Sequence, residues 1–214
     1  MDVDRFLREL PAQFDDFPRS EQPRELRYAE VLEAVPGLAQ PNNLALLNVA
    51  ASCLGEGEAY VEVGTFRGTS LIAAMLDNTG AFVALDNWSM GDGSREQLDL
   101  NLARFRLTGA EFLEGDAFET LRSGALEGRT VGVYYYDNGH EYEQQLDGMR
   151  LIEPYLASPA LVIVDDTDWE RVERAMDDYL AAQPRARRVL LLEGKDRGAP
   201  QWWEGMQVLV WDPE

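Results

Sequence analysis

Apolar strand-like runs alternate with helical patterns along most of the chain, and this alternation constrains the fold more than any other feature of the sequence. The predicted strands are rich in Val, Ile, Leu and aromatic residues without strict polar alternation, which is typical of strands that are buried on both faces. They are predicted at residues 59–63, 82–85, 111–113, 131–136 and 161–164. Helices are predicted at residues 69–77, 95–107, 119–123, 141–156 and 169–182. Such a repeat predicts a parallel sheet with helices on both faces.

The last part of the chain breaks this pattern. Two further strands are predicted at residues 187–192 and 206–211, and only a loop containing Gly194, Gly198 and Pro200 separates them. Strands that are joined without a helix pair in antiparallel fashion. The sequence therefore predicts a Rossmann-like, doubly wound α/β fold, with a mostly parallel sheet that ends in a C-terminal antiparallel β-hairpin.

Residues 1–40 differ from the rest, because they are polar and interrupted by prolines. Short amphipathic pieces at residues 3–10 and 25–35 predict an N-terminal helical cap or lid, which is a natural place for selecting a substrate. The main domain is then expected over residues 41–214. Its first helix is predicted at residues 42–54, with Asn42 or Asn43 as the N-cap.

Charge and length limit the classes of function. The chain has 214 residues, which suits one sizeable core, and a formal net charge of −20. So acidic a surface repels nucleic acids and anionic membranes and favours neutral or cationic small molecules, although adaptation to salt or a need for solubility explains the charge equally well. The N-terminus lacks the apolar core of a secretory signal, and the single cysteine, Cys53, is expected to be a buried, inert thiol. A cytoplasmic location is expected.

A glycine-containing turn follows the first predicted strand, within Tyr60–Ser70. Gly64 permits a tight exit from the strand, and Gly68 permits close backbone approach at the start of the next helix. A helix N-terminus attracts anions, so Thr69 and Ser70 can bond either the helix N-terminus or a ligand's carboxylate, and Glu62 can receive an ammonium group. Thr65, in the same turn, is also expected to bind the cofactor. The spacing departs from the G-x-G-x-x-G pattern of dinucleotide sites. A turn without any ligand is the alternative.

Two more strand ends carry residues suited to an adenosyl ligand. Asp86 ends the second strand and can accept hydrogen bonds from both ribose hydroxyls, while Trp88 can stack on adenine. After the third strand, Asp116 can meet the adenine amino group, and the Ala117 backbone N–H can meet a ring nitrogen. Because the carboxyl ends of parallel strands meet at one edge, these residues are expected to form one pocket. For Asp86, capping a loop is the alternative role.

Carboxylates also gather after the fourth and fifth strands. Asp137 and His140, the only histidine, follow the fourth strand, and Asp165 and Asp166 follow the fifth. Three carboxylates so close together would repel one another unless a divalent cation bound them, and oxygen ligands suit Mg²⁺, Ca²⁺ or Mn²⁺. A neutral histidine is also suited to act as a general base. The alternatives are a structural hydrogen bond for His140 and helix capping for the two adjacent aspartates.

Taken together, these residues resemble class I S-adenosylmethionine-dependent methyltransferases. Within that class the chain is most similar to the macrocin O-methyltransferase group of methyltransferase family 24, and distantly similar to catechol O-methyltransferase. The resemblance covers residues 40–214. It rests on Tyr60–Ser70, Asp86, Gly115–Ala117, Asp137 with His140 and Tyr142, and Asp165 with Asp166.

The resemblance implies a seven-stranded sheet with the reversed pair last, S-adenosylmethionine as cofactor, and methyl transfer to a hydroxyl of a small metabolite. It also implies Mg²⁺ or another divalent cation held by Asp137, Asp165 and Asp166, with Asp137 or His140 removing the substrate proton. The family usually has Asp-Gly-x-His, whereas this chain has Asp137, Asn138, Gly139 and His140. The geometry of this loop is therefore expected to differ from that of the family.

Two other functions fit the sequence. One is a catalytically inactive methyltransferase-like protein that binds a cofactor or metabolite, and an intact set of three aspartates argues against it. The other is a nicotinamide-dependent oxidoreductase, which the glycine spacing and the terminal hairpin disfavour.

Trp169 is expected either to line a substrate pocket or to pack a helix, and Trp202 and Trp203 either to pack in the core or to form a lid or dimer surface. The identity of the acceptor and the oligomeric state, with a homo-oligomer as one possibility, stay open.

Overall fold

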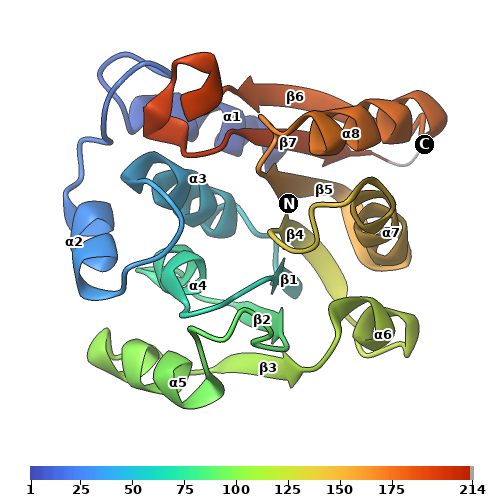
Figure 1. The fold of residues 1–214 in the computed structure, drawn as a ribbon, viewed down its shortest axis with the longest axis horizontal. Coiled ribbons are helices and arrows are strands. Elements are labelled where there is room, and N and C mark those ends of the chain that lie inside the picture. The colour runs from blue at the N-terminus through green and yellow to red at the C-terminus, as the bar shows by residue number, and fades with distance from the viewer. Residues whose placement is uncertain (213–214) are drawn as a thin grey trace.

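The computed structural model describes residues 1–212 and contains one seven-stranded sheet (Figure 1). The strand order is β3-β2-β1-β4-β5-β7-β6. The strands are β1 Glu58–Val63, β2 Ala81–Asp86, β3 Ala110–Glu114, β4 Thr130–Tyr136, β5 Leu156–Asp165, β6 Ala186–Leu192 and β7 Met206–Trp211. The order reverses between β1 and β4, so their connections leave in opposite directions and open a crevice at the carboxyl ends of both strands.

The predicted mixed topology is confirmed. β1 to β5 pair in parallel, whereas β7 pairs antiparallel with both β5 and β6. The C-terminal hairpin is therefore present at the sheet edge, and its second strand, β7, is inserted between β5 and β6. Only β7 runs against the other strands.

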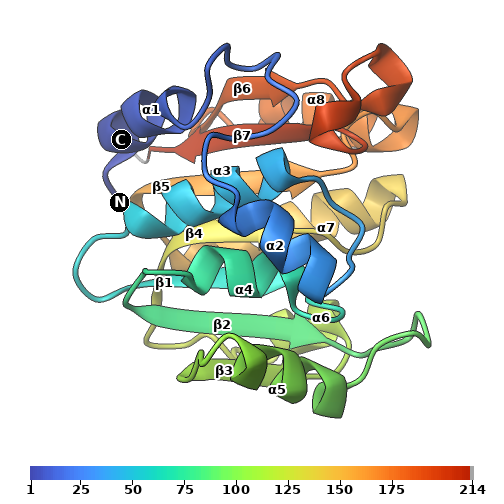
Figure 2. The same ribbon diagram turned by 90° about the vertical axis from the view of Figure 1, so that its left-hand side faces the viewer.

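Helices cover both faces of the sheet (Figures 1 and 2). On one face lie α1 Val3–Ala12, α2 Arg27–Ala34, α3 Pro41–Ser52, α4 Thr69–Met75 and α5 Arg95–Arg104. On the other lie α6 Ala117–Arg122, α7 Tyr142–Ile152 and α8 Glu170–Ala182. Three short 3₁₀ turns complete the regular structure: η1 Glu153–Tyr155, η2 Lys195–Arg197 and η3 Pro200–Trp202. Within the described residues, no helix combines the length and apolar character needed to cross a lipid bilayer.

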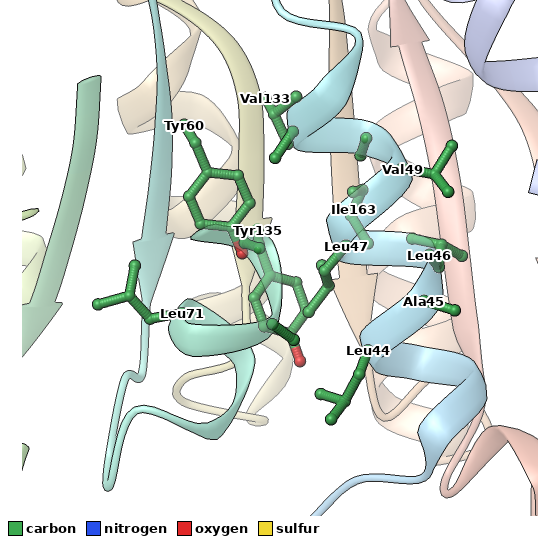
Figure 3. Packing of buried hydrophobic residues seen from close by; sticks show 14 of the residues in the cluster. Leu44, Ala45, Leu46, Leu47, Val49, Tyr60, Leu71, Val133, Tyr135 and Ile163 are labelled. Atoms are coloured by element: carbon green, nitrogen blue, oxygen red, sulfur yellow. The ribbon is translucent and has the colours of Figure 1, made fainter. Parts of the chain in front are cut away.

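Successive strand residues face opposite helical layers, as the pleat requires. Tyr60 and Tyr135 belong to the core beneath α3 and α4, whereas their neighbours Val61 and Tyr134 belong to the core beneath α6, α7 and α8. Figure 3 shows Tyr60 and Tyr135 beside α3, with Leu47 reaching toward them. Both layers are apolar because both faces of the sheet are covered, which explains the uninterrupted hydrophobic runs.

Two local predictions were wrong. The helix after residue 40 begins at Pro41, so Gln40 is the N-cap in place of Asn42 or Asn43; Asn43 instead accepts a hydrogen bond from the Gln40 backbone N–H at 3.1 Å. The helix predicted over residues 141–156 ends at Ile152, because Pro154 opens a 3₁₀ turn and Leu156 already begins β5.

The N-terminal segment is attached to the connection between β6 and β7. The Trp202 indole Nε1–H donates to the Pro18 carbonyl at 2.8 Å, and the rings of Phe14 and Phe17 lie 5.7 and 6.0 Å from that of Trp202. Figure 2 shows the N-terminal segment, in blue, crossing beside β6 and β7. Trp202 is fully buried, so it packs in the core and holds the two distant segments together.

The close approach at Gly64 gives a stability prediction. A Cβ at this residue, whose φ is +94°, would lie 1.7 Å from the Asp137 carbonyl oxygen. Gly64→Ala is therefore expected to lower the free energy of unfolding by about 3 kcal/mol or more, measured by urea denaturation. Gly109 is the matched control, because its φ is +90° and a Cβ there meets nothing within 4 Å; Gly109→Ala should cost about 1 kcal/mol. Equal losses in the two variants would contradict the steric argument.

Candidate functional site

A cavity of about 490 Å³ lies at the carboxyl ends of the central strands. Its size is typical of a site for a small molecule. The turn after β1, the ends of β2 and β4, and the loops that follow β3 and β5 all contribute to its wall. Of the predicted site residues, those that line it are Gly64, Thr65, Thr69, Ser70, Asp86, Trp88, Ala117, Asp137, His140 and Asp166.

The glycine turn forms the floor of the cavity. Gly68 is the N-cap of α4 with φ +88°, and a Cβ there would lie 2.3 Å from the Leu98 Cδ1. Any other residue would have to displace the Leu98 side chain of α5 and adopt a left-handed φ. The consequence is that Thr65 and Ser70 reach the cavity from either side of a tight turn.

Glu62 lies beneath this turn rather than in the cavity wall, because it is fully buried. Its carboxylate accepts hydrogen bonds from the Tyr60 hydroxyl at 2.9 Å and from the Ser70 hydroxyl at 3.2 Å. Burial raises the pKa of Glu62 from 4.5 to about 7, and the hydrogen bonds from Tyr60 and Ser70 oppose that rise. Glu62 therefore supports Ser70, which does line the cavity, and its own contact with a ligand stays a prediction.

Asp86 joins the end of β2 to the glycine turn. Its two carboxylate oxygens accept hydrogen bonds of 2.6 Å from the backbone N–H groups of Phe66 and Trp88. The Trp88 indole in turn donates to the Phe66 carbonyl at 3.0 Å. These three bonds fix the Asp86 carboxylate and the Trp88 ring in the wall of the same cavity.

The two residues predicted after β3 have different places. Gly115 and Ala117 line the cavity. Asp116 is exposed, and its side chain accepts a hydrogen bond from the Glu119 backbone N–H at 2.9 Å, which makes it the N-cap of α6. A contact between Asp116 and a ligand stays a prediction, and the capping bond already occupies one carboxylate oxygen.

A group of potential metal ligands lies on the opposite side of the cavity from Asp86's loop, at the ends of β4 and β5. Ligand atoms of Asp137, His140 and Asp166 all lie within 4.8 Å of one another. His140 Nε2 is 3.2 Å from an Asp166 carboxylate oxygen. The structure thus brings together two of the three predicted metal ligands with the predicted base.

Asp165, the third predicted ligand, belongs to a neighbouring hydrogen-bond network. Its carboxylate accepts a bond of 2.6 Å from the Tyr135 hydroxyl and one of 3.0 Å from the Asp166 backbone N–H. The Tyr135 hydroxyl is also 3.3 Å from the Asp137 carboxylate. Asp165 is therefore a buried neighbour of the group, and a role in holding a metal stays a prediction.

These buried acids resist ionisation. Burial, together with the charges of Asp165 and Asp166, raises the pKa of Asp137 well above its usual range. Burial and the Asp165 charge raise the pKa of Asp166 to about 8, and burial raises that of Asp165 to about 6. Burial also lowers the pKa of His140, with a further contribution from Arg171. A cation would relieve the repulsion among the carboxylates, and His140 is neutral near pH 7.

The wall contains an acid that the sequence analysis did not identify, and two of the tryptophans for which it left alternative roles open. Glu204, in the connection between β6 and β7, adds a carboxylate to the cavity, and Trp203 lies beside it. Trp169 also lines the cavity and packs edge-on against His140, with ring centroids 4.9 Å apart. From residues 1–40 only Gly37, Leu38 and Ala39 take part. No local pattern distinguishes Glu204 from the other glutamates, because its position depends on the folding of the hairpin.

Comparison with known proteins identifies a family for the chain. The model of a methyltransferase domain, family 24, matches residues 61–167, which is half of the chain. No curated protein matches the chain significantly in sequence.

Solved structures share the fold at low sequence identity. An O-methyltransferase from Bacillus cereus in complex with SAH has a TM-score of 0.67 and 16% identity, over 89% of this chain and 92% of its own. The O-methyltransferase TomG from Streptomyces achromogenes, involved in tomaymycin synthesis and solved with SAM, has a TM-score of 0.66 and 18% identity, over 90% and 92%. The SAH-bound methyltransferase PaMTH1 from Podospora anserina has a TM-score of 0.63 and 15% identity, over 99% and 95%.

The raised pKa of Glu62 predicts how stability depends on pH. Between pH 4.5 and about 7 the unfolded chain releases this proton while the folded chain keeps it, so the free energy of unfolding falls as pH rises. The pKa difference corresponds to about 3 kcal/mol. Urea denaturation of the ligand-free protein at pH 5 and pH 8 should show Glu62→Gln removing this loss. Glu56→Gln, an exposed control, should keep it. An unchanged pH dependence in Glu62→Gln would show that other groups cause it.

Proposed function

Since the chain belongs to the methyltransferase-domain family whose model matches residues 61–167, and is thus an enzyme of the transferase class, we propose that it transfers a methyl group from S-adenosylmethionine to a hydroxyl of a small metabolite. The observation that carries the proposal is the cavity that has the fixed Asp86 carboxylate on one side and the Asp137, His140 and Asp166 group on the other. One side suits the nucleoside, and the other suits an acceptor hydroxyl.

The adenosyl part of the cofactor fits the wall made by the ends of β2 and β3. In this arrangement Asp86 accepts hydrogen bonds from the ribose hydroxyls and Trp88 covers the adenine ring. Ala117 lies at the edge of the adenine. The amino-acid part fits the glycine turn, where Ser70 and the N-terminus of α4 suit the carboxylate. Glu62, below the turn, is to balance the ammonium group. The SAH and SAM complexes of the structural neighbours support this choice of cofactor.

The reaction needs an acceptor oxygen in line with the sulfur–methyl bond. The carbon–oxygen bond forms as the carbon–sulfur bond breaks, S-adenosylhomocysteine leaves, and the hydroxyl proton passes to a protein base. His140 suits this role, because its lowered pKa keeps it neutral and it lies beside Asp137 and Asp166. Holding donor and acceptor in one cavity supplies much of the rate acceleration.

The side chains present fit a divalent cation. The carboxylates of Asp137 and Asp166 converge with His140 within 4.8 Å, and the two acids would repel each other once ionised, which a cation would balance. Carboxylates suit Mg²⁺ or Mn²⁺. When bound, such an ion would lower the pKa of the acceptor hydroxyl. Asp137 and Asp166 are the proposed ligands, with Asp165 and Tyr135 holding them in position and His140 beside them as the base.

A cofactor-binding protein without catalysis is the other candidate. The same group of acids argues against it, because a binding module has no use for three costly buried carboxylates at the far side of its pocket.

Calorimetric titration tests the cofactor. S-adenosylmethionine and S-adenosylhomocysteine should both bind, and Asp86→Ala should weaken binding at least tenfold, because charged hydrogen bonds to the ribose are lost. Asp92→Ala, an exposed acid in the loop after β2, is the matched control and should bind as the wild type does. If the well-folded protein bound neither compound, the proposed function would be wrong.

Chelation and substitution test the metal group. Asp137→Ala and Asp166→Ala should abolish methyl transfer while binding S-adenosylhomocysteine within about threefold of wild type, because the changes lie outside the nucleoside side of the cavity. Excess chelator should stop transfer by the wild type, and added Mg²⁺ or Mn²⁺ should restore it. Full turnover in chelator would exclude a metal role, and full turnover by both variants would exclude these residues.

A further inference from the structure

The charge of the cavity wall limits the acceptors that it can take. Asp86, Asp137, Asp166 and Glu204 all line the cavity, and none of the lysines or arginines in residues 1–212 does. A phosphate or carboxylate on the acceptor would find no basic partner there and would be repelled by these acids. Neutral and cationic acceptors are left.

Glu204 is the lining acid that the reaction itself does not use. It is 9% exposed. One carboxylate oxygen pairs with Lys195, while the other, Oε2, is buried and has no hydrogen-bond partner among the described residues. An unsatisfied carboxylate oxygen is costly, and a positive group in the cavity that Glu204 lines would stabilise its charge.

The backbone around Glu204 is fixed, so the side chain cannot easily withdraw. The Asp168 backbone N–H donates to the Glu204 carbonyl at 2.8 Å, and the Lys195 backbone N–H donates to the Trp203 carbonyl at 2.6 Å. On the other side, buried Trp202 holds the connection against the Pro18 carbonyl. Glu204 is thereby held between the N-terminal segment and the loop that carries Asp166.

The surroundings of Glu204 favour a cation over a neutral donor. Glu204 and Asp166 both line the cavity, so a positive group placed there would be attracted by two neighbouring carboxyl groups. Trp203 and Trp169 line the same cavity, and both indoles already have a cation over one face: Lys195 at 4.8 Å and Arg171 at 4.9 Å. Indole faces and a carboxylate together form a good site for an ammonium group.

We propose that Glu204 is a specificity-determining residue that selects hydroxylated acceptors carrying a protonated amine, which the negative charge of its carboxylate attracts to the cavity wall. The inference rests on the proposed methyl transfer, because it places the amine at one end of the acceptor and the hydroxyl at the metal-ligand group. An aromatic amine-bearing phenol or an amino sugar has this chemistry.

Binding to the protein loaded with S-adenosylhomocysteine tests the acceptor class. Two matched series are titrated by calorimetry: tyramine, 4-ethylphenol and 4-hydroxyphenylacetate, and glucosamine, glucose and glucuronate. In at least one series the amine should bind at least tenfold more tightly than the neutral member, and the acid should bind most weakly. If no amine binds more tightly than its neutral counterpart, or if no amine binds, the inference is overturned.

Substitution then tests the residue. Glu204→Gln should lower the ratio of amine to neutral affinity at least tenfold, because a neutral amide lacks the charge that attracts the amine. Glu193→Gln removes the same charge from an exposed position on the same hairpin and should keep the wild-type ratio. An unchanged ratio in Glu204→Gln refutes the role of Glu204. Absence of S-adenosylhomocysteine binding in the wild type refutes the proposed function instead, so the two failures are distinguishable.

Discussion

The site depends on the close backbone approach between the turn after β1 and the end of β4. Gly64 lies against the Asp137 carbonyl, and the Asp137 backbone N–H donates to the Val63 carbonyl at 2.9 Å. This contact joins the two halves of the sheet where the strand order reverses. The contact leaves no room for a side chain at residue 64. The Asp86 loop and the Asp137 group can therefore approach closely enough to line one cavity.

Tyrosines of the core connect the packing of the sheet to the ionisation of the site. Tyr60 and Tyr135 are buried beneath α3 and α4, yet their hydroxyls reach the carboxylates of Glu62 and Asp165. Each ring therefore contributes apolar area to the core and a hydrogen bond to an acid that burial would otherwise leave unsatisfied. Burial of the acids is tolerated because the core itself supplies these donors. Burial still raises the pKa values of the acids, so a cationic ligand would favour their ionised form.

The architecture was predicted well because its signals are local. They are the apolar composition of the strands and the absence of a helical pattern between the last two strands. The start of β5 at Leu156 was missed because the apolar pattern of the helix was followed to residue 156, although Pro154 is a helix-ending signal. The sequence analysis also treated Asp165 and Asp166 as equivalent. Adjacent residues at a strand end point to opposite sides, and Asp166 has a φ of +55°. Asp166 therefore lies beside His140, whereas Asp165 accepts a hydrogen bond from Tyr135. Glu204 was missed because only the folded hairpin brings it to the cavity.

The position of β7 has a consequence for the order in which the molecule can be completed. β7 pairs with β5 on one side and β6 on the other, although it follows both in the chain. As the polypeptide leaves the ribosome, β5 and β6 must wait with open edges, and such edges invite pairing between chains. The nucleoside half of the cavity needs only β1 to β4 and can assemble early. The acceptor half is finished last, when the final strand closes the gap and draws Trp202 onto the N-terminal segment.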